Sequence, residues 1–253
     1  MELTYLKGHG TENDFVVLPD PDGSLDLTPE LVARLCDRRA GIGGDGVLRV
    51  VPTKLEPSAH GDAEWFMDYR NADGSIAEMC GNGVRVYARD LVAEGLAAPG
   101  AFALATRGGV KEVVVEDDVV TVDMGLAVVG EPVLVDGVVA TSVDMGNPHA
   151  VVHQTPPDVL DPDRKDLNVE YVEEVGPAHL RMRVHERGVG ETRSCGTGAC
   201  AAVVAHVLRT AEPRGTAYDV DVPGGRLQVT WREDGHVLLA GPAVIVASGT
   251  AFL

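Results

Sequence analysis

Several features that define other protein classes are scarce or missing in this chain of 253 residues. It has only four cysteines and neither a Cys-x-x-Cys nor a His-Glu-x-x-His pattern, so neither a disulfide scaffold nor a metal site is expected. No apolar run is long enough to cross a bilayer, and the segment that starts at Met1 does not resemble a secretory signal. We therefore expect a cytoplasmic protein with reduced thiols and no membrane partner.

Positive charge and aromatic side chains are also in short supply. The formal net charge is −18, which argues against nucleic acid as a partner, because such binding needs Lys and Arg to neutralise phosphates. Aromatic residues make up only 4%, so Ala, Val and Leu must form most of the core. With 45% hydrophobic residues, the chain can fill one large domain or two of about half its size.

The most informative feature is a short motif that occurs twice. Cys80-Gly-Asn-Gly83 and Cys195-Gly-Thr-Gly198 are each followed by apolar residues at helical spacing, and both runs begin four residues after the cysteine. This pattern predicts one face of an α-helix, repeated with the same phase. Each helix would carry a thiol at its N-terminus.

The two helices should differ in their surroundings. The second is apolar almost all round, so we expect it to be buried on every side. The first has charged residues on its other face and should be less enclosed, and these residues are Arg85, Arg89, Asp90 and Glu94. A further helix is predicted over 30–36, with Thr28 as its N-cap and Pro29 in its first turn.

Strand-like segments fill both halves of the chain. They lie at 15–18, 47–51, 64–69, 111–116, 119–123, 138–144, 150–153, 180–185, 219–222, 227–231 and 244–247. We infer an α+β fold of two similar domains, each a curled, mostly antiparallel and barrel-like sheet around a central helix. Residues 1–122 with 242–253 would form the Cys80 domain, and 123–241 the Cys195 domain. We expect a pseudo-twofold relation between them and an active site in the interdomain cleft.

A thiol at a helix N-terminus is suited to proton transfer. Only the thiolate is an effective base, and the unpaired N–H groups and positive dipole end of the helix favour the anion. The glycines bring backbone N–H groups close to a bound carboxylate. Either cysteine alone could be a small buried apolar residue beside a turn, but the matched pair favours chemistry with two mirrored halves.

The remaining cysteines and one histidine pair have simpler interpretations. Cys36 lies in the predicted first helix and Cys200 in an Ala/Val-rich stretch, so both should be core thiols. His149 and His153 are four residues apart, but Ala150 to Val152 between them are typical of a strand, which argues against a helical metal site.

The motifs resemble those of a known family. Asn71-Ala-Asp-Gly-Ser-x-x-x-Met-Cys-Gly-Asn-Gly-x-Arg85 and Glu186-Arg-Gly-x-Gly-Glu-Thr-x-x-Cys-Gly-Thr-Gly-Ala-Cys200 are similar to the two signatures of diaminopimelate epimerase. Supporting matches occur in the family's order at His9–Phe15, Met145–His149 and Pro223–Arg226.

The resemblance implies an isomerase that interconverts LL- and meso-diaminopimelate, in the synthesis of lysine and of the peptidoglycan precursor. The family works without pyridoxal phosphate, metal or another cofactor, and it uses two cysteines on opposite faces of the α-carbon. A homodimer is the expected assembly. Many relatives have a Tyr linked to dimer contact where this chain has Ala247, and a Gln where it has Gly46.

The resemblance also implies a role for particular residues. Cys195 matches the proton acceptor and Cys80 the proton donor, while His149 and Glu186 match positions that tune and orient the thiols. Arg187 is suited to the distal carboxylate, because a planar guanidinium can bind both oxygens. The expected substrate contacts are Asn13, Asn71, Gly81, Asn82, Asn147, Asn168, Glu186, Arg187, Gly196 and Thr197.

Three other functions remain open at this point. A proline or hydroxyproline racemase would share the cysteine pair, but such enzymes tend to have His in place of Asn82 and need no distal grip such as Arg187. A related isomerase would lack the two cysteines. A cytosolic binding or redox-sensing protein would use Cys80 and Cys195 as a switch, and this role is compatible with catalysis.

Overall fold

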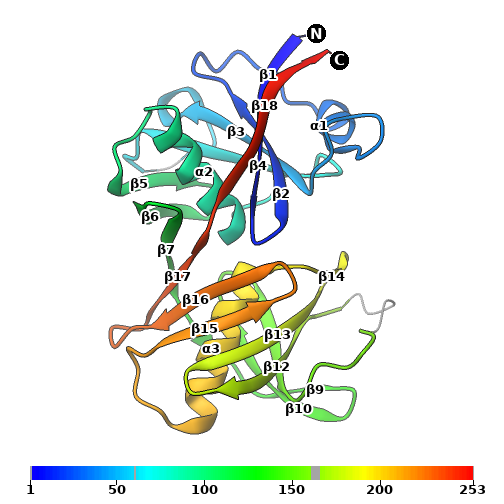
Figure 1. Cartoon of the computed structure of the whole chain (residues 1–253), viewed down its shortest axis with the longest axis vertical. Helices are drawn as coiled ribbons and strands as arrows, with labels where there is room; N and C mark the ends of the chain where they lie inside the picture. Colours follow the sequence, from blue (N-terminus) through cyan, green and yellow to red (C-terminus); the bar gives the residue numbers. More distant parts are fainter. Residues whose placement is uncertain (1, 60, 161–165, 253) are drawn as a thin grey trace. The chain divides into compact units, whose positions relative to one another are not determined.

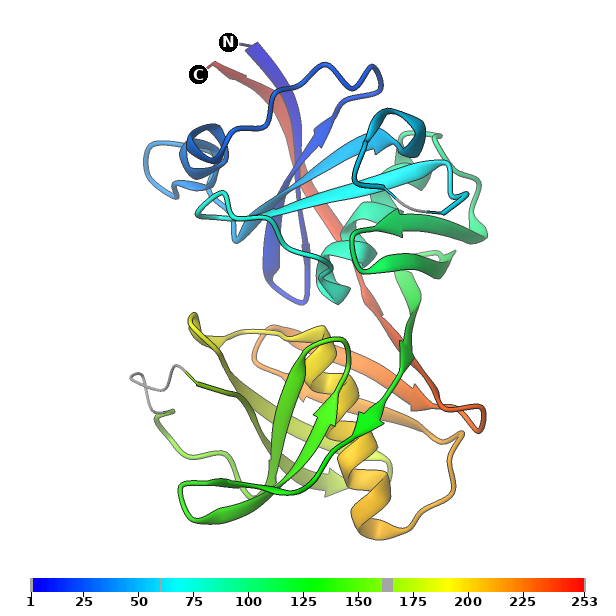
Figure 2. The same cartoon turned by 180° about the vertical axis from the view of Figure 1, so that it is seen from behind.

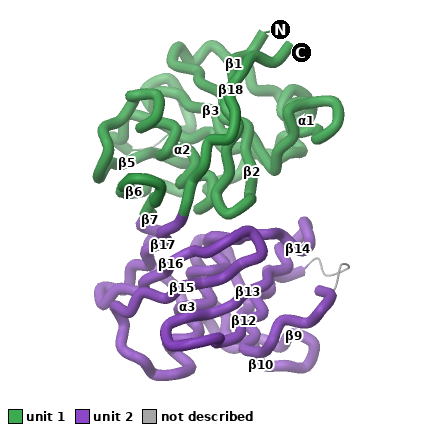
Figure 3. The backbone as a smooth tube through the Cα atoms, in the orientation of Figure 1, with its two compact units in different colours: residues 1–122, 242–253 green, residues 123–241 purple. Residues whose placement is uncertain are grey.

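The computed structural model describes residues 2–59, 61–160 and 166–252. The chain separates into two compact units, which Figure 3 shows in different colours. Unit 1 consists of residues 1–122 and 242–253, and unit 2 of residues 123–241. Both ends of the chain therefore belong to unit 1, where Glu2 pairs with Phe252 in neighbouring antiparallel strands.

Unit 1 is a sheet whose strands lie side by side in the order β18, β1, β2, β3, β4, β5, β6 and β7. Neighbouring strands are antiparallel except β2 with β3 and β4 with β5, which are parallel. The elements are β1 (Glu2–Gly10), β2 (Asn13–Pro19), α1 (Pro29–Cys36), β3 (Gly46–Pro52), η1 (Thr53–Leu55), β4 (Trp65–Asn71), α2 (Gly81–Ala93), β5 (Gly100–Thr106), β6 (Gly109–Glu116), β7 (Val119–Leu126) and β18 (Val244–Phe252).

Unit 2 is a second sheet, in the order β10, β11, β12, β13, β15, β16 and β17, with β8 and β9 beside β10 and β14 beside β13. Its elements are β8 (Val128–Val129), β9 (Val133–Val135), β10 (Val138–Asp144), β11 (Pro148–His153), β12 (Asn168–Gly176), β13 (His179–Glu186), β14 (Gly190–Thr192), α3 (Gly196–Thr210), β15 (Ala217–Val222), β16 (Gly225–Trp231) and β17 (His236–Pro242).

The two units repeat one topology. From β1 to β7, successive pairings run antiparallel, parallel, antiparallel, parallel, antiparallel and antiparallel, and the series β10, β11, β12, β13, β15, β16 and β17 has the same sequence of directions. Parallel neighbours need a crossover connection, and the second crossover of each unit contains its central helix. The predicted α+β fold of two similar, mostly antiparallel sheets is confirmed.

Each central helix is wrapped by its own sheet (Figures 1 and 2). Helix α2 contacts β1, β2, β3, β4, β6 and β18, and α3 contacts β10, β11, β12, β13 and β16. The prediction for the second helix is confirmed, because α3 buries every residue from Gly198 to Val207. No helix within the described residues is long and apolar enough to span a membrane.

The prediction that the first helix is less enclosed is wrong for its first three turns. Arg85 is 0% exposed and Asp90 is 1% exposed, because strands cover this face of α2 as well. The Arg85 guanidinium donates to Gly81 O at 3.4 Å and to Thr11 Oγ1 at 3.1 Å. Burial, with the nearby charge of Glu94, raises the pKa of Asp90 to about 7.

The small helix α1 begins and packs as its sequence indicates. Thr28 is the N-cap, and its Oγ1 accepts from the backbone N–H of Leu31 at 3.3 Å. Leu31, Val32 and Leu35 pack with Val47 of β3 in one buried cluster.

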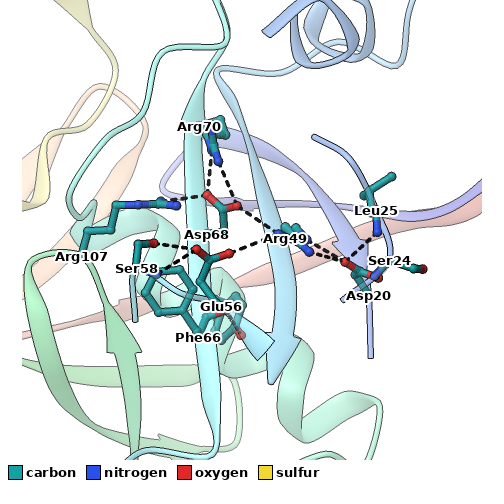
Figure 4. A network of polar contacts seen from close by, with 11 residues as sticks. Asp20, Ser24, Leu25, Arg49, Glu56, Ser58, Phe66, Asp68, Arg70 and Arg107 are labelled. Atoms are coloured by element: carbon teal, nitrogen blue, oxygen red, sulfur yellow. Dashed lines mark hydrogen bonds and ion pairs between the residues drawn. The ribbon is translucent and has the colours of Figure 1, made fainter. Parts of the chain in front are cut away.

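A buried charge network ties β3 and β4 to the loop that follows β2 (Figure 4). Arg49 contacts Asp20 at 2.7 Å, Glu56 at 3.3 Å and Asp68 at 3.5 Å. Asp68 is 0% exposed and also contacts Arg70, at 2.7 Å. Burial raises the pKa of the Asp68 carboxyl, but the surrounding guanidinium groups outweigh this effect and hold the pKa below its usual value.

Replacing Arg49 with Met should lower the free energy of unfolding by about 3 kcal/mol, because it leaves Asp20 buried without its cation. Urea unfolding at pH 7 measures this loss. The control is Arg232→Met, whose partner Asp234 has a side chain 47% exposed, and it should cost less than about 1 kcal/mol. Equal losses in the two variants would contradict the assignment of Arg49 as a buried structural cation.

Candidate functional site

Both cysteines of the duplicated motif are helix N-caps, as predicted. Cys80 caps α2 and Cys195 caps α3, and each Sγ accepts the backbone N–H three residues later, at 3.4 Å in both cases. Their backbones are extended, with φ of −141° and −125°. Each sulfur thus lies at the positive end of a helix dipole, which stabilises negative charge.

Glycine at the third position after each cysteine keeps the first turn close to the sulfur. A Cβ on Gly198 would lie 3.3 Å from Cys195 Sγ and 2.7 Å from Glu170 Oε1, so no larger residue fits there without a shift. A Cβ on Gly83 would lie 3.3 Å from Leu48 Cδ2, which is also tight. The second motif is therefore the more crowded, because a buried carboxylate lies against it.

An amide from β2 meets the first cysteine. Asn13 Oδ1 accepts from Cys80 Sγ at 3.6 Å and from Asn82 Nδ2 at 3.2 Å. The amide is held in this orientation because Asn13 Nδ2 donates to Asp45 Oδ2 at 2.8 Å, and Arg38 binds the other oxygen of Asp45 at 2.7 Å. In this geometry the Asn13 Oδ1 atom is placed to accept a hydrogen bond from the Cys80 sulfur.

Asn71 and Gly46 lie opposite each other in β4 and β3. The Asn71 side chain donates to Ser75 Oγ at 3.0 Å, so it orders the turn that follows β4. A Cβ on Gly46 would lie 2.5 Å from the backbone oxygen of Arg70. The backbone therefore fills the space of a side chain at this position.

Carboxylates surround the second cysteine. Cys195 is 7% exposed, and its Sγ is 3.5 Å from Thr197 Oγ1. Burial raises the pKa of the Cys195 thiol well above its ordinary value, and the charges of Glu186 and Glu170 raise it further. Thr192 donates its hydroxyl hydrogen to Glu186 Oε1. These effects favour the protonated thiol over the thiolate.

His149 is buried beside Glu170. Its Nδ1 is 2.6 Å from Glu170 Oε1, and both side chains are 0% exposed. Burial lowers the pKa of His149, but the charge and the hydrogen bond of Glu170 outweigh this effect and raise it above its ordinary value.

Asn168 links β11 to the segment that carries Arg187. Its Nδ2 donates to Pro148 O at 2.8 Å, and its Oδ1 accepts from the backbone N–H of Arg187 at 2.9 Å. Arg187 itself is exposed, with its backbone fixed by this bond. Asn147 lies in the preceding turn, where its carbonyl accepts from Met145 N at 3.1 Å.

The structure thus joins the predicted residues into local groups. Asn13, Cys80 and Asn82 form one group, Cys195 and Thr197 a second, and Asn168 with Arg187 a third. Sequence reasoning missed Asp45, which holds Asn13, and Glu170, which holds His149. The signal for Glu170 is a charged residue between Val169 and Tyr171, inside a run of strand-forming residues.

The other two cysteines lie in the core, as predicted. Cys36 is 5% exposed and Cys200 is 0% exposed. Burial raises the pKa of Cys36 to about 11, which makes it a poor nucleophile at neutral pH. Within the described ranges, no cluster of three or more His, Cys, Asp or Glu side chains has a geometry that could hold a metal ion.

Known proteins resemble this chain along nearly its whole length. The family model for diaminopimelate epimerase matches residues 5–130 and 141–246. A diaminopimelate epimerase of Streptomyces coelicolor is 53% identical, over 98% of this chain and 94% of the relative. Another, of Thermobifida fusca, is 51% identical, over 98% of this chain and 97% of the relative.

Solved structures of lower sequence identity share the fold. A Bacillus anthracis phenazine biosynthesis protein of the PhzF family aligns with a TM-score of 0.78 at 14% identity, over 100% of both chains. A hydroxyproline epimerase from Agrobacterium vitis aligns with a TM-score of 0.69 at 16% identity, over 99% of this chain and 92% of that one. These structures show the fold. The family model and the two relatives show that this chain belongs to the diaminopimelate epimerase family.

Proposed function

We propose that this chain interconverts LL- and meso-diaminopimelate by two-base proton transfer between Cys80, Cys195 and the substrate α-carbon. The observation that carries the proposal is the duplicated cap, a cysteine sulfur at the N-terminus of the central helix in each of two units with the same topology. Epimerisation removes a proton from one face of a carbon and adds one to the other. Two equivalent thiols match this requirement, and the product serves lysine and peptidoglycan precursor synthesis.

The two sulfurs have different surroundings, which suits their different roles. Cys80 donates to the neutral amide of Asn13, as a proton donor would. Cys195 has a raised pKa, so its thiolate, once formed, is a strong base toward a weakly acidic α-proton. His149 and Glu186 would tune and orient the two thiols. The reverse reaction exchanges the two roles.

The helix N-termini would stabilise the charge that builds on the substrate carboxylate. Gly81 and Asn82 begin α2, and Gly196 and Thr197 begin α3. Backbone N–H groups preorganised in a low-dielectric site stabilise such charge without reorganisation, and this stabilisation often contributes more to catalysis than any other single effect. No cofactor is needed to act as an electron sink in this scheme.

The remaining predicted residues would bind the far end of the diacid. Arg187 is exposed while its backbone is held by Asn168, so its guanidinium is available for the distal carboxylate. Asn71 ends β4 and Asn147 lies in a turn, and their side-chain amides would recognise the distal amino acid by paired hydrogen bonds. Amides that the bound substrate covers and that a wrong stereoisomer leaves unpaired would disfavour its binding.

Assembly and compartment follow from the same proposal. Strand β18 exposes Val244, Val246 and Phe252, which are 40%, 56% and 79% exposed, and an apolar outer strand of this kind favours pairing with a second copy. We expect a homodimer that uses this strand, with Ala247 in the contact. Four free cysteines, two of them needed as reduced thiols, suit the cytoplasm.

Incubation with LL-diaminopimelate in deuterated water should give meso product that carries deuterium at the inverted α-carbon, as mass spectrometry and NMR can measure. Cys80→Ala and Cys195→Ala should each abolish epimerisation, because each removes one of the two bases. Proline and trans-4-hydroxyproline serve as control substrates. Deuterium entry into proline but not into diaminopimelate would contradict the proposed substrate.

Replacing Arg187 with Ala should lower kcat/KM for diaminopimelate by about tenfold to hundredfold, because a charged hydrogen-bond pair to the distal carboxylate is lost. The matched control is Arg181→Ala on β13, whose side chain is 57% exposed and pairs with Glu173. Steady-state kinetics measure kcat/KM for both variants. An unchanged kcat/KM for the Arg187 variant would remove it from the site.

The purified chain should sediment as a dimer at micromolar concentration. Val246→Glu, at a β18 residue that is 56% exposed, should shift the chain toward the monomer because it places a charge in the expected apolar contact. Val110→Glu on β6, whose side chain is 41% exposed, is the control for a charge introduced at an exposed apolar position away from β18. A wild-type monomer would contradict the expected assembly.

A further inference from the structure

One buried acidic residue has no part in the scheme above. Glu170 lies on β12, its side chain is 0% exposed, and its Oε1 is 2.6 Å from His149 Nδ1 on the adjacent parallel strand β11. A buried carboxylate costs free energy unless it is paired, so this contact accounts for its presence. Two buried atoms of the pair, His149 Nε2 and Glu170 Oε2, have no hydrogen-bond partner among the described residues.

Glu170 also lies against the cap of α3. A Cβ on Gly198 would come within 2.7 Å of Glu170 Oε1 and within 3.3 Å of Cys195 Sγ, so the carboxylate and the sulfur flank the same backbone position. The positive end of the α3 dipole favours a negative charge there. One carboxylate thus contacts the imidazole of His149 and the first turn that holds the thiol.

We propose that Glu170 is a positioning residue for proton transfer, which fixes the ring and tautomer of His149 and braces the first turn of α3 beside Cys195. The proposal rests on the proposed function, since it assigns Glu170 to that same site. Glu170 holds the proton on His149 Nδ1, so His149 Nε2 is the atom that accepts or donates a proton during epimerisation. Glu170 acts through His149 and Cys195 and does not touch the substrate.

Carboxylates on three strands place negative charge near His149. Glu170 on β12, Glu186 on β13 and Asp144 on β10 all favour the protonated imidazole, and Cys195 on α3 has its own pKa raised by Glu170 and Glu186. Removing the Glu170 charge should therefore lower the pKa of both His149 and Cys195. These two shifts share one sign and one cause, which a loss of packing alone would not produce.

The test is Glu170→Gln, which keeps the volume and an oxygen that can accept from Nδ1 but removes the charge. The pKa of His149, followed by imidazole NMR and assigned with His149→Gln, should fall by about one unit or more. Alkylation of Cys195 by iodoacetamide at pH 8 should become several-fold faster, since more of the thiol is ionised. The kcat for diaminopimelate should fall at least about tenfold, with a smaller change in KM.

The matched control is Glu173→Gln on the same strand, where the carboxylate faces Thr155 and Arg181 at the surface, and it should leave all three readouts unchanged. An Nδ1 atom that NMR finds unprotonated in wild-type His149 would overturn the proposal, whether or not the variant folds. A Glu170→Gln variant with low activity but an unchanged His149 pKa would overturn it too. The NMR measurement of the His149 pKa needs no substrate. A wild-type protein that does not turn over diaminopimelate would therefore overturn only the proposed function.

Discussion

A cysteine sulfur in the place of a helix N-cap is the constraint on which the rest of this structure depends. Most helices use a hydroxyl, amide or carboxylate oxygen there, and sulfur is a weaker acceptor. The Sγ atoms of Cys80 and Cys195 still reach 3.4 Å from a backbone N–H because Gly83 and Gly198 leave room for the turn to approach. A sheet that wraps each helix then keeps water from the central turns, so the dipole acts at low dielectric.

The two caps share backbone geometry but differ in electrostatics. Cys80 meets the neutral amide of Asn13, whereas Cys195 lies near the carboxylates of Glu170 and Glu186. Proton transfer across one carbon needs one sulfur that gives a proton and one that takes it, so identical environments would serve it poorly. The duplicated fold places the two sulfur atoms in equivalent positions, and the surrounding side chains give them different electrostatic environments.

Local sequence patterns predict the helices and their caps, but they do not predict contacts between segments that are far apart in the chain. Both central helices and the Thr28 cap follow from spacing and capping rules alone. Strand β1 is not evident from the sequence because Lys7, Gly8 and His9 interrupt its alternation, and its register depends on β18, at the other end of the chain. The burial of Arg85 was missed for a related reason, since amphipathic patterns assume that one helix face meets water.

In the candidate site, too, the motif residues can be predicted from the sequence but the contacts between strands cannot. Cys80 and Cys195 could be located from the motif, but the contact between His149 and Glu170 needs the pairing of β11 with β12, which no local pattern reveals. Asp45 likewise reaches Asn13 only because β2 and β3 are parallel neighbours.

Gly46 and Asn168 occupy equivalent positions in the two units but have different surroundings. Gly46 opens β3 and Asn168 opens β12, and each pairs with the strand before it, at Phe15 and His149 respectively. In unit 2 the Asn168 amide fixes the backbone of Arg187, which must present an exposed guanidinium. The register makes Ala72 the counterpart of Arg187 in unit 1, and Ala72 packs against the core cluster of α1. In unit 1 no side-chain amide stands at this point, because the Arg70 carbonyl lies 2.5 Å from where a Cβ on Gly46 would be.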